Sequence, residues 1–235
     1  MQLAIVLYQG MTTLDAIGPY EVLRFLPDVD LRFVSHEPGP IMTDSGVLAL
    51  GATHSFAETP EPDMILLPGS MADTATAMAD EELVGWIKKV HPGTTWTLSV
   101  CTGALILAAA GVLDGHPATT HWAAQSALGP FGVDARREDR IVRSGKIVTA
   151  AGVSAGIDLA LWLYGEIVGR EEAEIIQLSI EYDPQPPFDA GHPGKASREV
   201  FKKARKEMLI RARNPLDMIS IPKIAWNRLI DKIRG

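Results

Sequence analysis

The sequence predicts an α/β fold in which helices cover both faces of a mostly parallel sheet. Four short apolar runs have the length and composition of buried strands: residues 3–8, 31–35, 64–68 and 95–100. Helix-like stretches lie between and after them, at about 16–26, 80–90 and 102–110. Parallel neighbours need long crossover connections, usually helices, so this alternation indicates a parallel sheet.

The remaining chain predicts a hairpin, two helices and a loop. Residues 140–150, "RIVRSGKIVTA", have the pattern of a β-hairpin, and helices are predicted at about 154–168 and 171–182. Residues 183–194 are too rich in Pro and Gly for a helix. We therefore expect one α/β domain over residues 1–194 and a helical extension over residues 195–235.

Composition points to an ordinary cytoplasmic protein. The 235 residues are 46% hydrophobic, enough for one substantial core. A single cysteine cannot form an internal disulfide, and the first residues, "MQLAIVLYQG", lack the features of a signal peptide. No run approaches the roughly 20 apolar residues of a membrane helix.

Charge is distributed unevenly along the chain. Residues 195–235 contain twelve Lys and Arg against four Asp and Glu, a net +8, whereas residues 1–194 carry −15. A basic segment can bind nucleic acid or an anionic membrane. Apolar residues such as Val200, Phe201 and Leu209 interleave with the basic ones. This favours an amphipathic extension lying on the acidic body of its own or a partner subunit, with no nucleic-acid or membrane partner.

Three predicted strand ends carry chemically useful residues. Asp15 follows the first strand, Gly69 and Ser70 follow the third in a tight turn, and Cys101 and Thr102 follow the fourth. Ligands of open α/β sheets bind beyond the carboxyl ends of the strands. Parallel strands would bring these residues to one edge of the sheet.

Cys101, the only cysteine of the chain, lies where a strand ends and a helix starts, in "SVCTGAL". A sharp turn at this point would present the side chain as in the nucleophile elbow of hydrolases. Unpaired N–H groups at the helix start favour a thiolate. The alternative is an unreactive core thiol, because free cysteine is among the most buried residue types.

Asp15 and His121 each have two interpretations. Asp is a preferred N-cap, so Asp15 would cap a helix that begins near Ala16, with Pro19 in its first turn. A carboxyl group that faced Cys101 could instead take the thiol proton or activate water. His121, in "ATTHWA", is either a base for Cys101 or a histidine packed beside Trp122.

Metal and cofactor sites are not indicated by the sequence. No set of His, Cys and carboxylate residues has metal-ligand spacing, and no phosphate-binding glycine motif follows a strand. We therefore expect neither a metal nor a cofactor.

Four segments together resemble the ThiJ/PfpI superfamily, which has the flavodoxin-like fold of class I glutamine amidotransferases. They are "LDAIGPYEVL", "MILLPGS", "SVCTGALILAAAGVLDGHPATTHW" and "GVSAGIDLAL", and the similarity runs from about residue 2 to about 190. The resemblance is strongest to the isocyanide hydratase branch, which has an aspartate where many members have a glutamate.

The resemblance implies a nucleophile at Cys101, with Thr102 beside it and Asp15 as the acidic partner. It also implies a homodimer. The reaction would add water to an isocyanide, R–NC, through a Cys101 thioimidate and release an N-substituted formamide. Gly69 and Ser70 would bind substrate and stabilise developing charge, and His121 is a possible accessory.

Two departures from the family pattern bear on the substrate. The turn often written Pro-Gly-Gly is Pro-Gly-Ser here, so the Ser70 side chain could crowd the pocket or add a hydroxyl. Ala150 and Ala151 stand where a run of glycines is more typical of the hydratases.

Two other functions stay open at this level. One is a glyoxalase-like or redox and carbonyl-stress protein that uses the same thiol. The other is the ligand-sensing domain of an AraC-type regulator, which is disfavoured because only 41 residues follow Gly194, too few for paired helix-turn-helix units.

Overall fold

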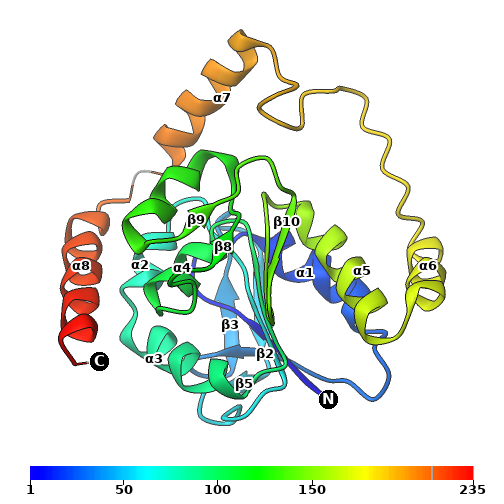
Figure 1. Cartoon of the computed structure of the whole chain (residues 1–235), viewed down its shortest axis with the longest axis horizontal. Coiled ribbons are helices and arrows are strands. Elements are labelled where there is room, and N and C mark those ends of the chain that lie inside the picture. The colour runs from blue at the N-terminus through cyan, green and yellow to red at the C-terminus, as the bar shows by residue number, and fades with distance from the viewer. Residues whose placement is uncertain (213, 235) are drawn as a thin grey trace.

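Seven strands form the central sheet within the part of the chain that the computed structural model describes, residues 1–212 and 214–234 (Figure 1). Their order is β10-β11-β7-β6-β1-β2-β5, and β10 alone among these seven runs antiparallel to its neighbour. The bounds are Gln2–Val6 (β1), Asp30–Ser35 (β2), His54–Ser55 (β5), Met64–Leu67 (β6), Trp96–Val100 (β7), Ile141–Ser144 (β10) and Ile147–Ala150 (β11).

The three central strands bring the chemically useful residues to one edge. Strand β6 is buried along its whole length, and β1 and β7 are buried from their second residue onward. Ile5, Leu66 and Leu98 stand in register across these parallel strands. Their carboxyl ends therefore meet at one edge, as the sequence predicted.

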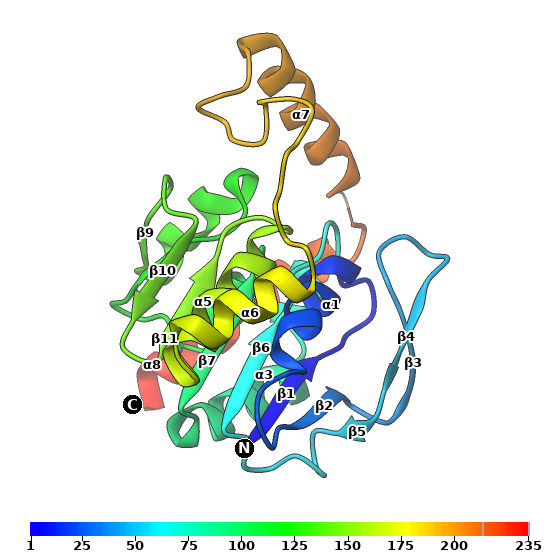
Figure 2. The same ribbon diagram turned by 90° about the vertical axis from the view of Figure 1, so that its right-hand side faces the viewer.

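Helices cover both faces of the sheet (Figures 1 and 2). On one face lie α1 (Thr13–Leu23), α5 (Ala155–Ile167) and α6 (Arg170–Ser179); on the other lie α2 (Thr74–Met78), α3 (Glu81–Val90) and α4 (Gly103–Ala109). The short helix α4 is buried throughout. Its first residue must be glycine, because a Cβ on Gly103 would lie 2.1 Å from the carbonyl oxygen of Leu67 in β6.

The predicted fold class is confirmed, and each predicted strand and helix of the sheet region is present with slightly shifted ends. Helix α1 is the main correction, because it begins at Thr13 rather than near Ala16 and contains Pro19 in its interior. Several elements were not predicted: strands β3 (Gly39–Met42), β4 (Ala49–Ala52), β5, β8 (Pro117–Ala118) and β9 (Asp134–Ala135), helix α2, and the 3₁₀ segments η1 (His91–Gly93) and η2 (Trp122–Phe131). Strands of two to four residues carry too little alternation to be recognised.

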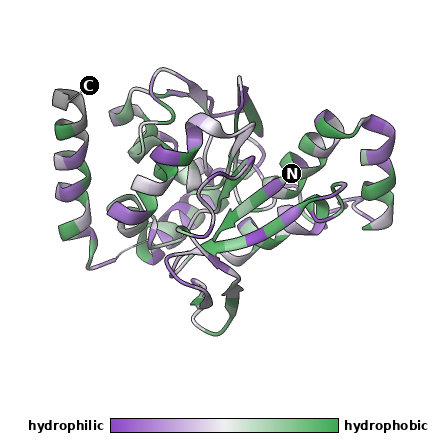
Figure 3. Cartoon of the chain, turned by 90° about the horizontal axis from the view of Figure 1, so that it is seen from below, coloured by the Kyte–Doolittle hydropathy of each residue, from purple (hydrophilic) through white to green (hydrophobic). Residues whose placement is uncertain are grey.

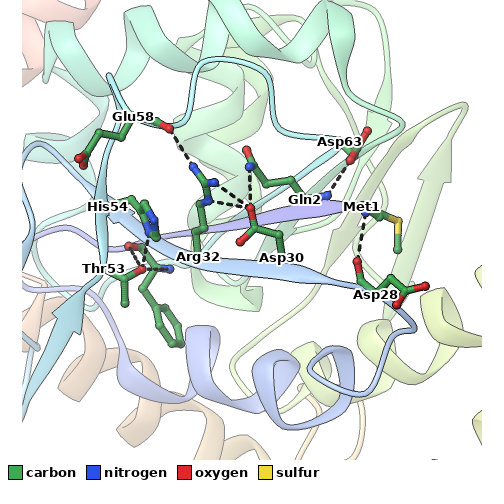
Figure 4. A network of polar contacts seen from close by, with 10 residues as sticks. Met1, Gln2, Asp28, Asp30, Arg32, Thr53, His54, Glu58 and Asp63 are labelled. Atoms are coloured by element: carbon green, nitrogen blue, oxygen red, sulfur yellow. Dashed lines mark hydrogen bonds and ion pairs between the residues drawn. The ribbon is translucent and has the colours of Figure 1, made fainter.

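The opposite edge of the sheet is tied by a polar network (Figure 4). The Gln2 backbone N–H donates to Asp63 at 2.6 Å, and its side-chain amide donates to Asp30 at 2.9 Å. Arg32 binds the same Asp30 carboxylate and also donates to the Glu58 carbonyl oxygen at 2.8 Å. These contacts anchor the first residues of β1 and β2, far from the edge that carries Cys101.

The extension forms two helices, α7 (Arg198–Arg211) and α8 (Asp217–Arg234). Helix α7 stands over the carboxyl edge of the sheet, whereas α8 packs beside α2 (Figure 1). Lys223 of α8 also pairs with Glu81, the first residue of α3, at 3.0 Å. Green and purple residues alternate along α8 in Figure 3, and Met218 and Trp226 leave apolar surface exposed on it. No helix in the described ranges is long and apolar enough to cross a membrane.

Candidate active site

Cys101 occupies a strained backbone position between β7 and α4. Its φ of 58° lies in the left-handed region that non-glycine residues rarely adopt. Two hydrogen bonds hold it there: the Cys101 N–H donates to the Ala151 carbonyl oxygen at 2.8 Å, and the Thr120 hydroxyl donates to the Cys101 carbonyl oxygen at 2.7 Å. Such strain persists where surrounding contacts over-determine it, as in a nucleophile elbow.

Asp15 points from the first turn of α1 toward Cys101. The N-cap of α1 is Thr12, so the interpretation of Asp15 as the helix cap is wrong. The side chain is fully buried, and its Oδ2 accepts a hydrogen bond from the Gly69 N–H at 2.8 Å. The carboxyl group and the Cys101 thiol each shift the pKa of the other, and Asp15 Oδ1 is buried without a hydrogen-bond partner among the described residues. A carboxyl group and a thiol thus share one buried site.

Burial shifts the proton affinities of both groups. It raises the pKa of Asp15 to about 7, against the lowering effects of the Gly69 N–H and the thiol. Burial and then the Asp15 charge raise the pKa of Cys101 well above its ordinary value, although the N–H groups of Thr102 and Val153 oppose them. Burial and the Asp15 charge therefore oppose the thiolate that the helix start favours, and Asp15 is the group whose pKa lies near neutrality.

Gly69, Ser70 and Thr102 form a tightly connected turn beside this pair. The Ser70 N–H donates to the Thr102 hydroxyl at 2.9 Å, and the Gly69 N–H is engaged by Asp15. The Ser70 hydroxyl donates to the Gly10 carbonyl oxygen at 2.6 Å and accepts from the Asp73 N–H. Both backbone donors of the turn, and the extra hydroxyl, are thus used within the chain.

A cavity of about 500 Å³ opens over Cys101. Its apolar lining comes from Met71, Trp122, Val153, Phe201, Met208 and Leu209. His121 also lines it, half-buried, with Nδ1 accepting from the Ala123 N–H at 3.3 Å and with burial lowering its pKa. No hydrogen bond joins His121 to Cys101 among the described residues, and His121 packs beside Trp122 at 5.5 Å between ring centroids.

Helix α7 supplies one wall of this cavity, which sequence reasoning missed. Phe201, Arg205, Met208 and Ala212 follow helical spacing and all line the cavity. Phe201 packs against Trp122 of η2 at 5.4 Å between ring centroids, which fixes the helix over the site. Part of the extension therefore lies on the catalytic edge of its own chain, and the spacing of these residues was the available signal.

Two buried hydroxyl residues were also missed. Besides Thr120, Tyr8 lies against the site: its hydroxyl donates to the Pro68 carbonyl oxygen at 3.0 Å. Burial, and then the charges of Asp15 and Cys101, raise the pKa of Tyr8 well above its ordinary value. Tyr8 ends an apolar, strand-like run, and Thr120 is one of two adjacent threonines. Neither pattern by itself indicates a functional site.

The arrangement can move one proton between sulfur and carboxylate while an electrophile sits in an apolar cavity. No group of three or more His, Cys, Asp or Glu residues in the described ranges could hold a metal ion. The end of β11 and the residue after it contact the elbow, because the Cys101 N–H lies 3.2 Å from the Ala150 carbonyl oxygen and 2.8 Å from that of Ala151. The two alanines that depart from the family pattern therefore contact the Cys101 backbone through their carbonyl oxygens.

Comparison with known proteins matches this fold and site to one family. Residues 1–165 match the model of the DJ-1/PfpI family. The chain is 41% identical over 206 residues to a protein named isonitrile hydratase from Pseudomonas putida, which covers 88% of this chain and 89% of that protein.

Two further relatives are a ThiJ/PfpI family protein of known structure and a transcriptional regulator. The crystal structure of a ThiJ/PfpI family protein from Pseudomonas syringae has a TM-score of 0.85 and 34% identity, over 93% of this chain and 90% of that one. The HTH-type transcriptional regulator CdhR of Pseudomonas aeruginosa is 26% identical over 74% of this chain, but the match covers only 52% of that regulator.

Proposed function

The chain belongs to the DJ-1/PfpI family, and we propose that it is a cysteine-dependent isocyanide hydratase. One observation carries the proposal: a cysteine at a strained elbow faces a buried carboxyl group whose pKa is about 7, at the base of an apolar cavity. The similarity to a protein named isonitrile hydratase over most of both chains supports the same reaction.

The first step adds the thiol across the isocyanide carbon. Asp15 takes the Cys101 proton as sulfur forms a bond to the terminal carbon of R–N≡C, and the carboxyl group passes that proton to the same carbon. The product is a thioimidate, R–N=CH–S–Cys101, with the carboxylate restored. Because the pKa of Asp15 is about 7, the carboxyl group can both accept and return a proton near neutrality, and bond formation to carbon offsets the cost of deprotonating the thiol.

The second step adds water to the thioimidate. The Asp15 carboxylate takes a proton from water as the oxygen bonds to carbon, and the carboxyl group passes that proton to the nitrogen. Collapse of the R–NH–CH(OH)–S adduct breaks the carbon–sulfur bond, returns a proton to sulfur and releases R–NH–CHO. The overall change is R–NC plus water to the formamide, so no oxidant or cofactor is consumed.

The neighbouring turn acts on the substrate indirectly in this proposal. The Gly69 N–H orients the Asp15 carboxylate, and the Ser70 N–H orients the Thr102 hydroxyl. We therefore assign these two N–H groups positioning roles, because neither is free to donate to an oxyanion. The Thr102 and Val153 N–H groups stabilise charge that develops on sulfur. His121 contributes to the cavity wall.

The organisation of the protein is part of the same proposal. We keep residues 1–194 as the catalytic domain and residues 195–235 as an extension whose α7 completes the cavity wall. The exposed apolar side chains of Met218, Ile219 and Trp226 on α8 support a homodimer. The lone cysteine supports a cytoplasmic location, where thiols stay reduced.

Mass spectrometry of the intact protein tests the mechanism. Mixing with an isocyanide should give a transient mass increase equal to that of the isocyanide, located on Cys101, and the formamide should accumulate. Cys101→Ala should give neither. Glyoxal offered to the same preparation separates the carbonyl-stress alternative, and exclusive consumption of glyoxal would overturn the hydratase assignment.

A further inference from the structure

Two arginines stand over the Cys101 cavity. Arg137 comes from the segment between β9 and β10, and Arg205 comes from α7. Both residues line the cavity and are exposed, whereas Cys101, which lines the same cavity, is buried.

Neither arginine is neutralised within the described part of the chain. Arg136 and Arg140, the neighbours of Arg137, pair with Asp134 and Asp158, whereas no ion pair involves Arg137 or Arg205. The chain as a whole carries a net charge of −7, so it contains more carboxylates than basic side chains that they could pair with.

Two carboxyl groups of this region, Asp15 and Asp44, already accept hydrogen bonds from other groups. Asp15 is buried and bound by the Gly69 N–H, and Asp44 accepts a hydrogen bond from the Thr12 hydroxyl at 2.6 Å. The walls between the arginines and Cys101 are mostly apolar. A ligand that satisfies the whole cavity therefore needs an apolar body, a reactive end toward sulfur and an anionic end toward the two arginines.

Resting on the proposed hydratase function, we propose that the substrate is an isocyanide that carries a carboxylate on an apolar scaffold. The carboxylate binds Arg137 and Arg205, and the isocyanide carbon reaches Cys101. Guanidinium groups match the planar, two-oxygen geometry of a carboxylate. The formamide product keeps the carboxylate, so it binds the same two residues.

Three probes on one scaffold test this: 4-isocyanobenzoate, its neutral methyl ester and phenyl isocyanide. An exposed ion pair contributes a factor of roughly a few in affinity, so two give about a tenfold higher kcat/KM for the carboxylate over the ester. Arg137→Gln and Arg205→Gln should each reduce that ratio, and the double variant should abolish it. Arg198→Gln, on the same helix but outside this cavity, should leave the ratio unchanged.

A binding measurement separates this inference from the function on which it rests. Titration calorimetry should show 4-formamidobenzoate binding more tightly than its methyl ester to the wild type, with the difference lost in the double variant. Turnover of all three isocyanides without preference for the carboxylate overturns the anionic substrate and leaves the hydratase in place. Selective binding of the anion without turnover of any isocyanide supports the arginine site and contradicts the hydratase.

Discussion

The buried Asp15 carboxyl group and the Cys101 thiol shift each other's proton affinity: the Asp15 charge raises the pKa of the thiol, and the thiol lowers the pKa of the carboxyl group. The two residues come from separate strand ends that meet only because β1, β6 and β7 are adjacent and parallel. The first two predictions follow from the raised pKa of Asp15.

Asp15→Asn should reduce kcat by roughly 10² to 10⁴, the usual contribution of a general acid–base group. The carboxylate form must accept the thiol proton, so wild-type kcat/KM should rise with pH through about 7, and the variant should lack this rise. Asp44→Asn should move the wild-type midpoint to lower pH, because the Asp44 charge raises the pKa of Asp15. A pH–rate profile from pH 5.5 to 9 checks this, and an unchanged profile in Asp15→Asn would count against the relay.

Asp15→Asn should also make the protein more stable at alkaline pH. The pKa of Asp15 is about 7 in the folded chain against an ordinary 3.8, so the folded state binds the proton more tightly. The associated stability is present below pH 3.8 and is lost as pH rises to 7, an upper limit on the order of 4 kcal/mol. Urea unfolding at several pH values should show that the free energy of unfolding of the variant rises relative to that of the wild type from pH 4 to 8. The exposed Asp189→Asn should show no such trend.

Gly69→Ala should damage both stability and activity. Its Cβ would lie 2.4 Å from the Thr102 backbone nitrogen, which cannot move without shifting the elbow. We expect a loss of about 1–3 kcal/mol in the free energy of unfolding and a much larger relative loss of kcat. Gly85→Ala is the matched control: nothing lies within 4 Å, and alanine in an exposed helix should stabilise by about 0.5–1 kcal/mol. Thermal unfolding and turnover measurements of both variants test this, and a Gly69→Ala variant with wild-type stability and kcat would contradict it.

Phe201→Ala tests whether α7 forms a wall of the cavity in solution. Loss of the aromatic contact with Trp122 should raise KM about two- to tenfold and leave kcat within about twofold, because no reacting group is removed. Val200→Ala, one residue earlier on the same helix, is outside the cavity and should leave KM unchanged. Equal KM values in wild type and Phe201→Ala would show that α7 lies elsewhere.

The sequence predicted most of the sheet region because its signals are local. Buried strands need apolar runs of fixed length, and residues 64–68 and 95–100 have them. Asp15 was harder, since a carboxylate near a helix start fits both a cap and a site. The helix proved to start at Thr13, three residues earlier than expected, which turned the side chain inward.

The sequence by itself determined the α/β class, the turn that presents Cys101 and the strand ends that carry Asp15 and Gly69. Tertiary structure alone decided that burial and Asp15 raise the pKa of the thiol, that the Gly69 and Ser70 N–H groups are already engaged, and that α7 lines the cavity. Strand and turn formation depend on neighbouring residues in the chain. Proton affinity and cavity shape depend on burial and on groups distant in sequence, which only the packed chain brings together.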